Sequence, residues 1–210
     1  MDKIKLAVPT LIMSVGVSAS GKTTFFKELV KLVYDTFLID KDTINNAFLL
    51  KPVINDGSIE SYRFSEQVIP KDSNYYHKNV KLQSYHALLK IAKDNLEVGK
   101  HPILDAPYVK ELRRGYLQEV VNPFFKEINY QTKVIFCYAD EEVIRQRMKE
   151  RNSERDRAKL SSEDSWRKFL EEQPILPPEL EGISHVKIDT TQSLEQKLRM
   201  VLDYLITSST

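Results

Sequence analysis

The stretch Gly16-Val-Ser-Ala-Ser-Gly-Lys-Thr23 matches the pattern G-x-x-x-x-G-K-[S/T] at every fixed position. The two glycines let the backbone turn sharply and point successive N–H groups at phosphate oxygens. The Lys22 ammonium would reach the terminal phosphates of a nucleotide, and the Thr23 hydroxyl would ligate Mg²⁺. The pattern therefore predicts a nucleotide-binding loop, with contacts from Gly16, Ser18, Ala19, Ser20, Gly21, Lys22, Thr23 and Thr24.

Three aspartates stand where apolar runs of the chain end. Asp40 and Asp42 follow the run 36–39, and Asp105 ends the run 101–105. A carboxylate beside an acceptor hydroxyl can orient it and take its proton during phosphoryl transfer, and we assign this role to Asp42. Asp105 suits Mg²⁺ binding, together with Thr23, or a hydrogen bond to the acceptor. The alternatives are structural: a helix cap for Asp42, a solvated strand end for Asp40 and a turn for Asp105.

The segment 145–159 is strongly basic, with seven Lys and Arg residues against three acidic ones, although the chain as a whole is balanced. On one continuous helix, Arg147, Arg151 and Arg155 would share a face, because they are spaced four residues apart. Guanidinium groups arranged in this way can neutralise the charge on a transferred phosphoryl group. The alternative is a solvated surface helix with ion pairs along it.

The elements that must position these residues alternate between short apolar runs and longer helical patterns. Helical spacing of apolar residues is found over 22–33, after Asp42 as N-cap, around 112–120, over 141–157 and over 193–205. Uninterrupted apolar runs predict strands that are buried on both faces of a parallel sheet. We therefore predict an α/β fold with five parallel strands, at 10–15, 36–39, 101–105, 133–138 and 185–188.

The polar stretch 51–80 interrupts this rhythm and shows no clear periodicity. About thirty residues of this kind inside a compact domain predict a functional loop or lid. It contains aromatic and basic residues that could stack a base and hold a phosphate, or could form a patch that holds the insertion on the core. These residues are Tyr62, Arg63, Tyr75, Tyr76 and His77.

Length and composition limit the remaining classes of protein. The 210 residues suit a single domain, and 41% hydrophobic residues are enough to build a core. A formal net charge of +1 argues against a protein that coats nucleic acid, so nucleic acid is expected only as a short or end-bound substrate. With one cysteine, no long apolar run and no signal-peptide pattern, we expect a cytoplasmic protein without a membrane partner.

Four blocks of the sequence, taken in order, resemble the P-loop kinases related to phage polynucleotide, zeta-toxin-type, gluconate and nucleoside monophosphate kinases. They are the glycine loop with Thr24, Ile39-Asp-Lys-Asp42 with Asn45, Gly99–Pro107 with Arg113 and Arg114 downstream, and Glu150-Arg-Asn-Ser-Glu-Arg-Asp156. The resemblance implies a sheet in the order 2-3-1-4-5 and a mobile lid that closes over ATP. It also implies Asp42 as general base and Arg151 and Arg155 as contacts of the ATP phosphates.

These observations together predict an ATP- and Mg²⁺-dependent phosphotransferase, with Lys22, Asp42, Arg151 and Arg155 in catalysis. The acceptor would be a hydroxyl group of a small molecule, a nucleoside or a 5′-hydroxyl polynucleotide end, and Asp40, Arg63 and Arg113 are its candidate contacts. The alternatives are an NTPase that drives a partner and a non-catalytic nucleotide-sensing module. We expect one domain over 1–210, with an acceptor-side insertion at 51–80 and an arginine-rich lid at 145–172.

Overall fold

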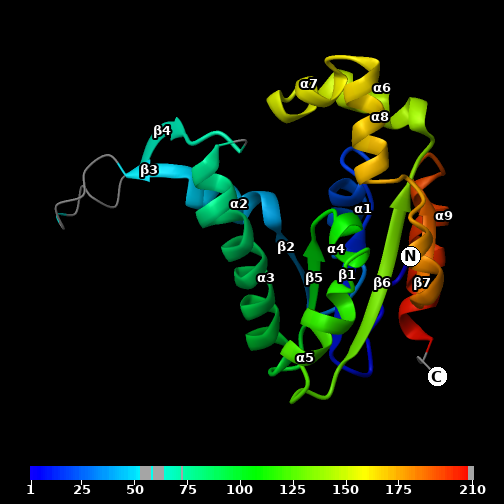
Figure 1. Ribbon diagram of the computed structural model, residues 1–210. Helices are drawn as coiled ribbons and strands as arrows, with labels where there is room; N and C mark the ends of the chain where they lie inside the picture. Colours follow the sequence, from blue (N-terminus) through cyan, green and yellow to red (C-terminus); the bar gives the residue numbers. More distant parts are fainter. Residues whose placement is uncertain (53–57, 59–63, 72, 208–210) are drawn as a thin grey trace.

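The computed structural model describes residues 1–52, 58, 64–71 and 73–207. Its centre is a five-stranded sheet in which all neighbouring strands are parallel (Figure 1). Counted along the chain, the spatial order is 2-3-1-4-5, which confirms the predicted α/β class and strand order. In space the strands are β2 (Thr36–Asp40), β5 (His101–Asp105), β1 (Thr10–Val15), β6 (Gln131–Tyr138) and β7 (His185–Asp189).

The sheet is buried on both faces because the central strands carry apolar side chains on both sides. All six residues of β1 and all five of β5 are buried. Helices α1 (Lys22–Leu29) and α9 (Leu194–Ile206) pack on one face. Helix α3 (Lys81–Leu96) contributes to the apolar core of the other face.

The register of the strands determines which side chains meet at their carboxyl ends. Asp40 of β2 is paired with Asp105 of β5, and Asp105 is also paired with Ser14 of β1. The carboxyl ends of parallel strands are where α/β proteins bind their ligands. The two aspartates and the glycine loop that follows β1 therefore share one edge of the sheet.

The chain between β2 and α3 projects from the edge of the sheet (Figure 1). Helix α2 (Lys41–Leu49) leads into the antiparallel pair β3 (Leu50–Pro52) and β4 (Phe64–Val68), and the π-helical turn η2 (Tyr76–Val80) precedes α3. The predicted irregular stretch 51–80 thus contains a short hairpin. Tyr62 and Arg63 lie outside the described residues.

Three helices lie beyond the carboxyl ends of the strands, on the side of the sheet where the glycine loop is found (Figure 1). They are α6 (Glu141–Arg151), α7 (Glu154–Leu160) and α8 (Glu163–Glu172), and we call them the α6–α8 group. The prediction of one helix over 141–157 is wrong, because Asn152 adopts a left-handed φ of 46° and ends α6. Arg155 therefore does not continue the helical face of Arg147 and Arg151.

Three other predicted helices differ from the observed ones. The helix expected around 112–120 is divided into α4 (Val109–Leu112), the π-helical η3 (Leu117–Val121) and the short α5 (Asn122–Phe124), with Gly115 at φ 71° between α4 and η3. Helix α1 ends at Leu29, four residues earlier than expected. Asp40, and not Asp42, is the N-cap of α2.

The short 3-10 helix η4 (Pro178–Gly182) leads toward β7. Among the described residues, no helix is both long enough and apolar enough to cross a membrane.

Candidate active site

The loop between β1 and α1 is held tightly between the two neighbouring strands. The Gly16 N–H donates to Pro107 O over 3.0 Å, just beyond β5. On the other side, a Cβ at Gly16 would lie 2.2 Å from Cys137 O in β6, and the residue has a φ of 144°. Only glycine fits here, since a side chain would meet backbone and the φ is one that L-residues avoid.

The interior of the loop is arranged to bind an anion. Ala19 takes a left-handed φ of 64° and Gly21 a left-handed φ of 89°, directly before α1 begins at Lys22. Successive N–H groups in such a turn, followed by a helix N-terminus, form a concave site for phosphate. The Lys22 Nζ donates to Gly16 O over 2.7 Å and to Val17 O over 2.8 Å, which places a buried ammonium directly on this loop.

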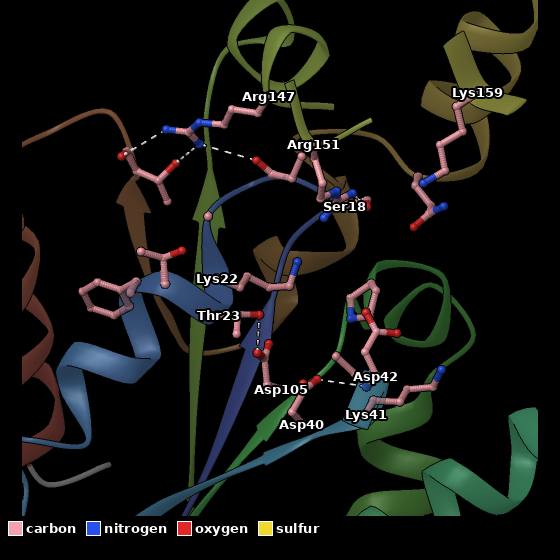
Figure 2. Close-up of a pocket in the computed structure, with 18 of the residues that line it drawn as sticks. Ser18, Lys22, Thr23, Asp40, Lys41, Asp42, Asp105, Arg147, Arg151 and Lys159 are labelled. Atoms are coloured by element: carbon pink, nitrogen blue, oxygen red, sulfur yellow. Dashed lines mark hydrogen bonds between the residues drawn. The ribbon is translucent and has the colours of Figure 1, made fainter. Parts of the chain in front are cut away.

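Asp105 links the loop to β5 and supplies oxygens of the kind that Mg²⁺ prefers. Its Oδ2 accepts from the Thr23 hydroxyl over 2.6 Å (Figure 2), and its Oδ1 accepts from the Ser14 hydroxyl over 2.8 Å. A carboxylate and a hydroxyl beside a phosphate-binding loop fit Mg²⁺, which binds through one or two carboxylates and keeps other ligands from water and phosphate. The two predicted metal ligands, Thr23 and Asp105, are thus in direct contact.

Asp40 and Asp42 have different surroundings although they are two residues apart. Asp40 Oδ1 accepts from the Asp42 N–H and Oδ2 accepts from the Thr43 hydroxyl, both over 2.9 Å, so this carboxylate caps α2. The Asp42 side chain is 43% exposed and forms an ion pair of 3.1 Å with Lys71. Both line the cavity, but only Asp42 has its carboxylate outside the capping hydrogen bonds of α2, which suits it to receive a proton.

Two arginines of α6 reach the glycine loop from above. Arg147 donates to the Thr190 hydroxyl over 2.9 Å and contacts Ala19 O at 3.5 Å (Figure 2). Arg151 donates to the Ser18 hydroxyl over 2.8 Å. Arg147 was grouped with Arg151 by its spacing, and the structure brings both guanidinium groups to the loop.

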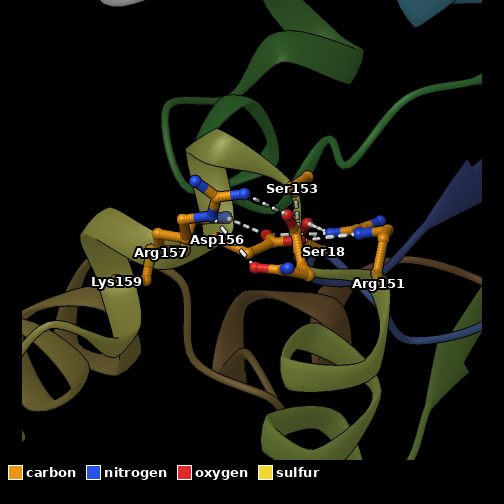
Figure 3. Close-up of polar contacts among 7 residues, drawn as sticks. Ser18, Arg151, Ser153, Asp156, Arg157 and Lys159 are labelled. Carbon is orange, nitrogen blue, oxygen red and sulfur yellow. Dashed lines mark hydrogen bonds and ion pairs between the residues drawn. The ribbon is translucent and has the colours of Figure 1, made fainter.

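Arg151 is held in place by a buried carboxylate (Figure 3). Its Nε and one terminal nitrogen donate to the two oxygens of Asp156 over 2.6 and 2.9 Å, and the Asp156 side chain is fully buried. Burial alone would raise the pKa of Asp156, but hydrogen bonds from Arg151 and Ser153 and the nearby charges of Arg151 and Lys159 keep that pKa below its usual value. Asp156 is therefore a charged anchor for Arg151.

One cavity of about 630 Å³ is lined by the site residues Lys22, Thr23, Asp40, Asp42, Asp105, Arg147 and Arg151. It extends from the glycine loop past Asp105 to Asp42, and the sequence analysis missed several residues of its wall. The missed residues include Lys41, Lys71, Gln173, Thr190 and Lys197. Lys159 also lines the cavity and belongs to the basic segment 145–159 noted in the sequence.

Of the candidate residues Arg113, Arg155 and Arg63, only Arg113 has a side chain that the structure describes. Arg113 is not among the residues that line the cavity; it donates to Glu179 over 2.8 Å and to Glu171 O over 3.0 Å, so the structure does not support its role as an acceptor contact. The backbone of Arg155 belongs to α7, while its side chain and the whole of Arg63 lie outside what the structure describes. Within the described residues, no cluster of three or more His, Cys, Asp or Glu side chains could hold a metal ion.

The strand order, the glycine loop and the cavity beside it define a P-loop protein with a kinase-like fold. The chain belongs to the AAA domain family AAA_33, whose sequence profile matches residues 11–174. No curated protein matches the sequence significantly.

Solved structures show the same fold at low sequence identity. A protein thought to be a kinase from Chloroflexus aurantiacus is 18% identical with a TM-score of 0.63, over 94% of this chain and 96% of that one. Kti12 from Chaetomium thermophilum, solved with ADP-AlF3, is 15% identical with a TM-score of 0.57. The match covers 94% of this chain and 100% of that one. Shikimate kinase from Acinetobacter baumannii is 17% identical with a TM-score of 0.55, over 96% and 97%.

Proposed function

We propose that this protein transfers the γ-phosphoryl group of ATP to a hydroxyl acceptor in a Mg²⁺-dependent reaction. The observation that carries the proposal is the arrangement of one cavity, with Lys22 and Thr23 at the phosphate loop and the carboxylate of Asp42 in the same space.

The charges along the cavity suit the course of the reaction. Lys22 and the loop amides would hold the β- and γ-phosphates, and Arg147 and Arg151 would neutralise the transferring group. Thr23 and Asp105 would hold Mg²⁺, which when bound shields phosphate charge and orients the phosphates. Positioning and electrostatics then provide most of the rate, since phosphoryl transfer needs little covalent chemistry from the protein.

Asp42 would act on the acceptor. As the acceptor oxygen forms its bond to the γ-phosphorus, the bond from that phosphorus to the bridging oxygen breaks and ADP leaves. The proton of the acceptor hydroxyl passes to the Asp42 carboxylate. The ammonium of Lys71, 3.1 Å from Asp42, favours the ionised carboxylate that is needed before transfer.

The proposal is tested with γ-labelled ATP and Mg²⁺ against separate pools of 5′-hydroxyl oligonucleotides, nucleosides and sugar acids. We expect label to move to one pool, and Asp42→Asn and Lys22→Ala to abolish this transfer. Asp203→Asn is the matched control, because Asp203 is exposed on α9 and does not line the cavity.

The same assay separates the kinase from its rivals. Label released only as inorganic phosphate, with Asp42→Asn as active as the wild type, would contradict the kinase and indicate an NTPase. Binding of ATP without turnover in any pool would instead indicate a nucleotide-sensing module.

A further inference from the structure

Lys41 is a buried cation in the wall of the cavity, and none of the described carboxylates serves as its counter-ion. Lys41 is only 7% exposed. Its Nζ lies 3.5 Å from the Tyr76 hydroxyl and 4.7 Å from the centre of the Tyr85 ring. Across the described residues, no carboxylate forms an ion pair with it. Buried charges in proteins are normally paired, so an unpaired ammonium facing a cavity points to a ligand that supplies the missing negative charge.

A second polar group on the same face of α2 also lacks a partner. Asn45 follows Lys41 by one helical turn and is 1% exposed, and in the described part of the chain neither atom of its side-chain amide has a hydrogen-bond partner. Nearly all buried amides are hydrogen-bonded, and those that are not require an explanation. Of these two residues of α2, only Lys41 lines the cavity, so its charge and not the Asn45 amide is available to a ligand there.

The position of Lys41 within the cavity separates it from the phosphate loop. Arg147 and Arg151 lie at one end of the cavity, whereas Lys41 and Asp42 lie at the other end, on α2 (Figure 2). A nucleotide whose phosphates occupy the loop therefore leaves the α2 end for the acceptor. A group held by Lys41 would lie next to the carboxylate that is proposed to take the acceptor's proton.

We infer that Lys41 is the anion-recognising element of the acceptor subsite, and that the acceptor is a hydroxyl compound carrying a carboxylate or phosphate group. This inference rests on the proposed function. A point charge on a flexible stem can bind either kind of anion.

The electrostatic surroundings of Lys41 agree with this assignment. Burial lowers the pKa of Lys41 to about 8; the charges of Asp42 and Glu111 oppose this change, while Lys71 and Lys81 add to it. Surrounding carboxylates thus fail to compensate for the loss of water around the ammonium. An anion bound at Lys41 would restore its pKa toward the ordinary value.

Binding is tested first, without any need for turnover. The titration of Lys41 is followed by NMR on ¹³C-labelled lysine, assigned through Lys41→Met, with a non-hydrolysable ATP analogue filling the phosphate loop in every sample. The probes are acetate, inorganic phosphate and, as a neutral match for acetate, acetamide. We expect acetate or phosphate to raise the pKa of Lys41 and acetamide to leave it unchanged. If neither anion alters the titration, the inference is wrong.

Turnover is then compared for matched acceptors, gluconate against glucose and adenosine 3′-monophosphate against adenosine. We expect kcat/KM to favour the anionic member of one pair by about ten- to a hundredfold, the range of a charged hydrogen bond. Lys41→Met should remove this preference while nucleotide affinity stays within about twofold. The lower kcat/KM of the variant for the anionic acceptor should come from a higher KM for that acceptor.

The outcomes separate the inference from the function on which it rests. Equal use of both members, or a preference that survives in Lys41→Met, overturns the inference and leaves the kinase intact. Absence of transfer to every acceptor, with Lys41 still responding to anions, overturns the kinase and retains the anion site.

Discussion

The Thr23 hydroxyl donates to Asp105 Oδ2 over 2.6 Å and thereby joins the start of α1 to the end of β5. The other oxygen of the same carboxylate accepts from Ser14 on β1. One aspartate thus fixes the three elements that surround the phosphate loop. A Mg²⁺ ion that uses Thr23 and Asp105 would bind to ligands that are already in position.

Asp105→Asn should weaken nucleotide binding only when Mg²⁺ is present. The amide can still accept a hydrogen bond from Thr23, but it no longer supplies the negative charge that favours the cation. We expect the affinity for ATP in Mg²⁺ to fall by about tenfold or more, with little change in EDTA. Isothermal titration in both buffers measures this difference. An equal loss in both buffers would show that Asp105 supports the loop and not the metal.

Gly16→Ala should lower the free energy of unfolding far more than Gly99→Ala, although both glycines have a positive φ. At Gly99, with φ 80°, an added Cβ meets nothing within 4 Å, so the expected loss is the conformational strain alone, about 1 kcal/mol. At Gly16 the Cβ also meets Cys137 O at 2.2 Å, so the backbone must move, at a further cost of about 1–3 kcal/mol. Urea denaturation measures both, and similar losses for the two variants would contradict the clash.

Arg151 and Asp156 should act as a unit. Arg151→Ala removes the guanidinium from the loop, and Asp156→Asn removes the charge that holds it there. We expect each single variant to lower kcat/KM by about tenfold or more, and the double variant to lose little beyond Arg151→Ala, because both changes remove the same interaction. A double-mutant cycle measures the coupling. Additive losses would show that Asp156 contributes to the structure independently of Arg151.

The free energy of unfolding should depend on pH through Lys41. Burial lowers the pKa of Lys41 from 10.5 to about 8. Below pH 8 both the folded and the unfolded chain carry the proton, and the folded chain bears the full cost of burying the charge. Between these two values the folded chain has lost the proton while the unfolded chain keeps it, so stability rises with pH.

The expected gain over this interval, measured against Lys41→Met, is roughly 3 kcal/mol. Comparison with the variant cancels the contributions of other titrating groups. A difference in unfolding free energy that is the same at pH 7.5 and pH 10.5 would contradict the lowered pKa.

Features that depend on a short stretch of chain were predictable from the sequence. The strand His101–Asp105 has the predicted bounds, because an apolar run ends there at a charged residue. The glycine loop was recognised because its chemistry requires fixed residue types at fixed spacing. Its position between β1 and α1 follows from the same local pattern.

Features that depend on distant contacts could not be predicted in this way. The break at Asn152 is not one of them, because Asn tolerates a left-handed backbone at a helix end and Ser is favoured as an N-cap, so Asn152-Ser153 was a local sign that a single helix was wrong. The burial of Lys41 depends on Tyr76 and Tyr85, which come much later in the chain. A lysine between two aspartates reads as a solvated residue until those aromatic rings are in place.

The only tryptophan of the chain lies within the α6–α8 group. Trp166 is fully buried on α8, donates through its indole N–H to Glu141 on α6 over 2.6 Å, and lies under the guanidinium of Arg145 at 5.3 Å. Its fluorescence therefore reports on the packing of α8 against α6. The only cysteine, Cys137, is buried, which raises the pKa of its thiol to about 12 and makes it unreactive. The natural chain thus carries its own optical reporter for this group, and a single engineered surface thiol would provide a second one without competing background.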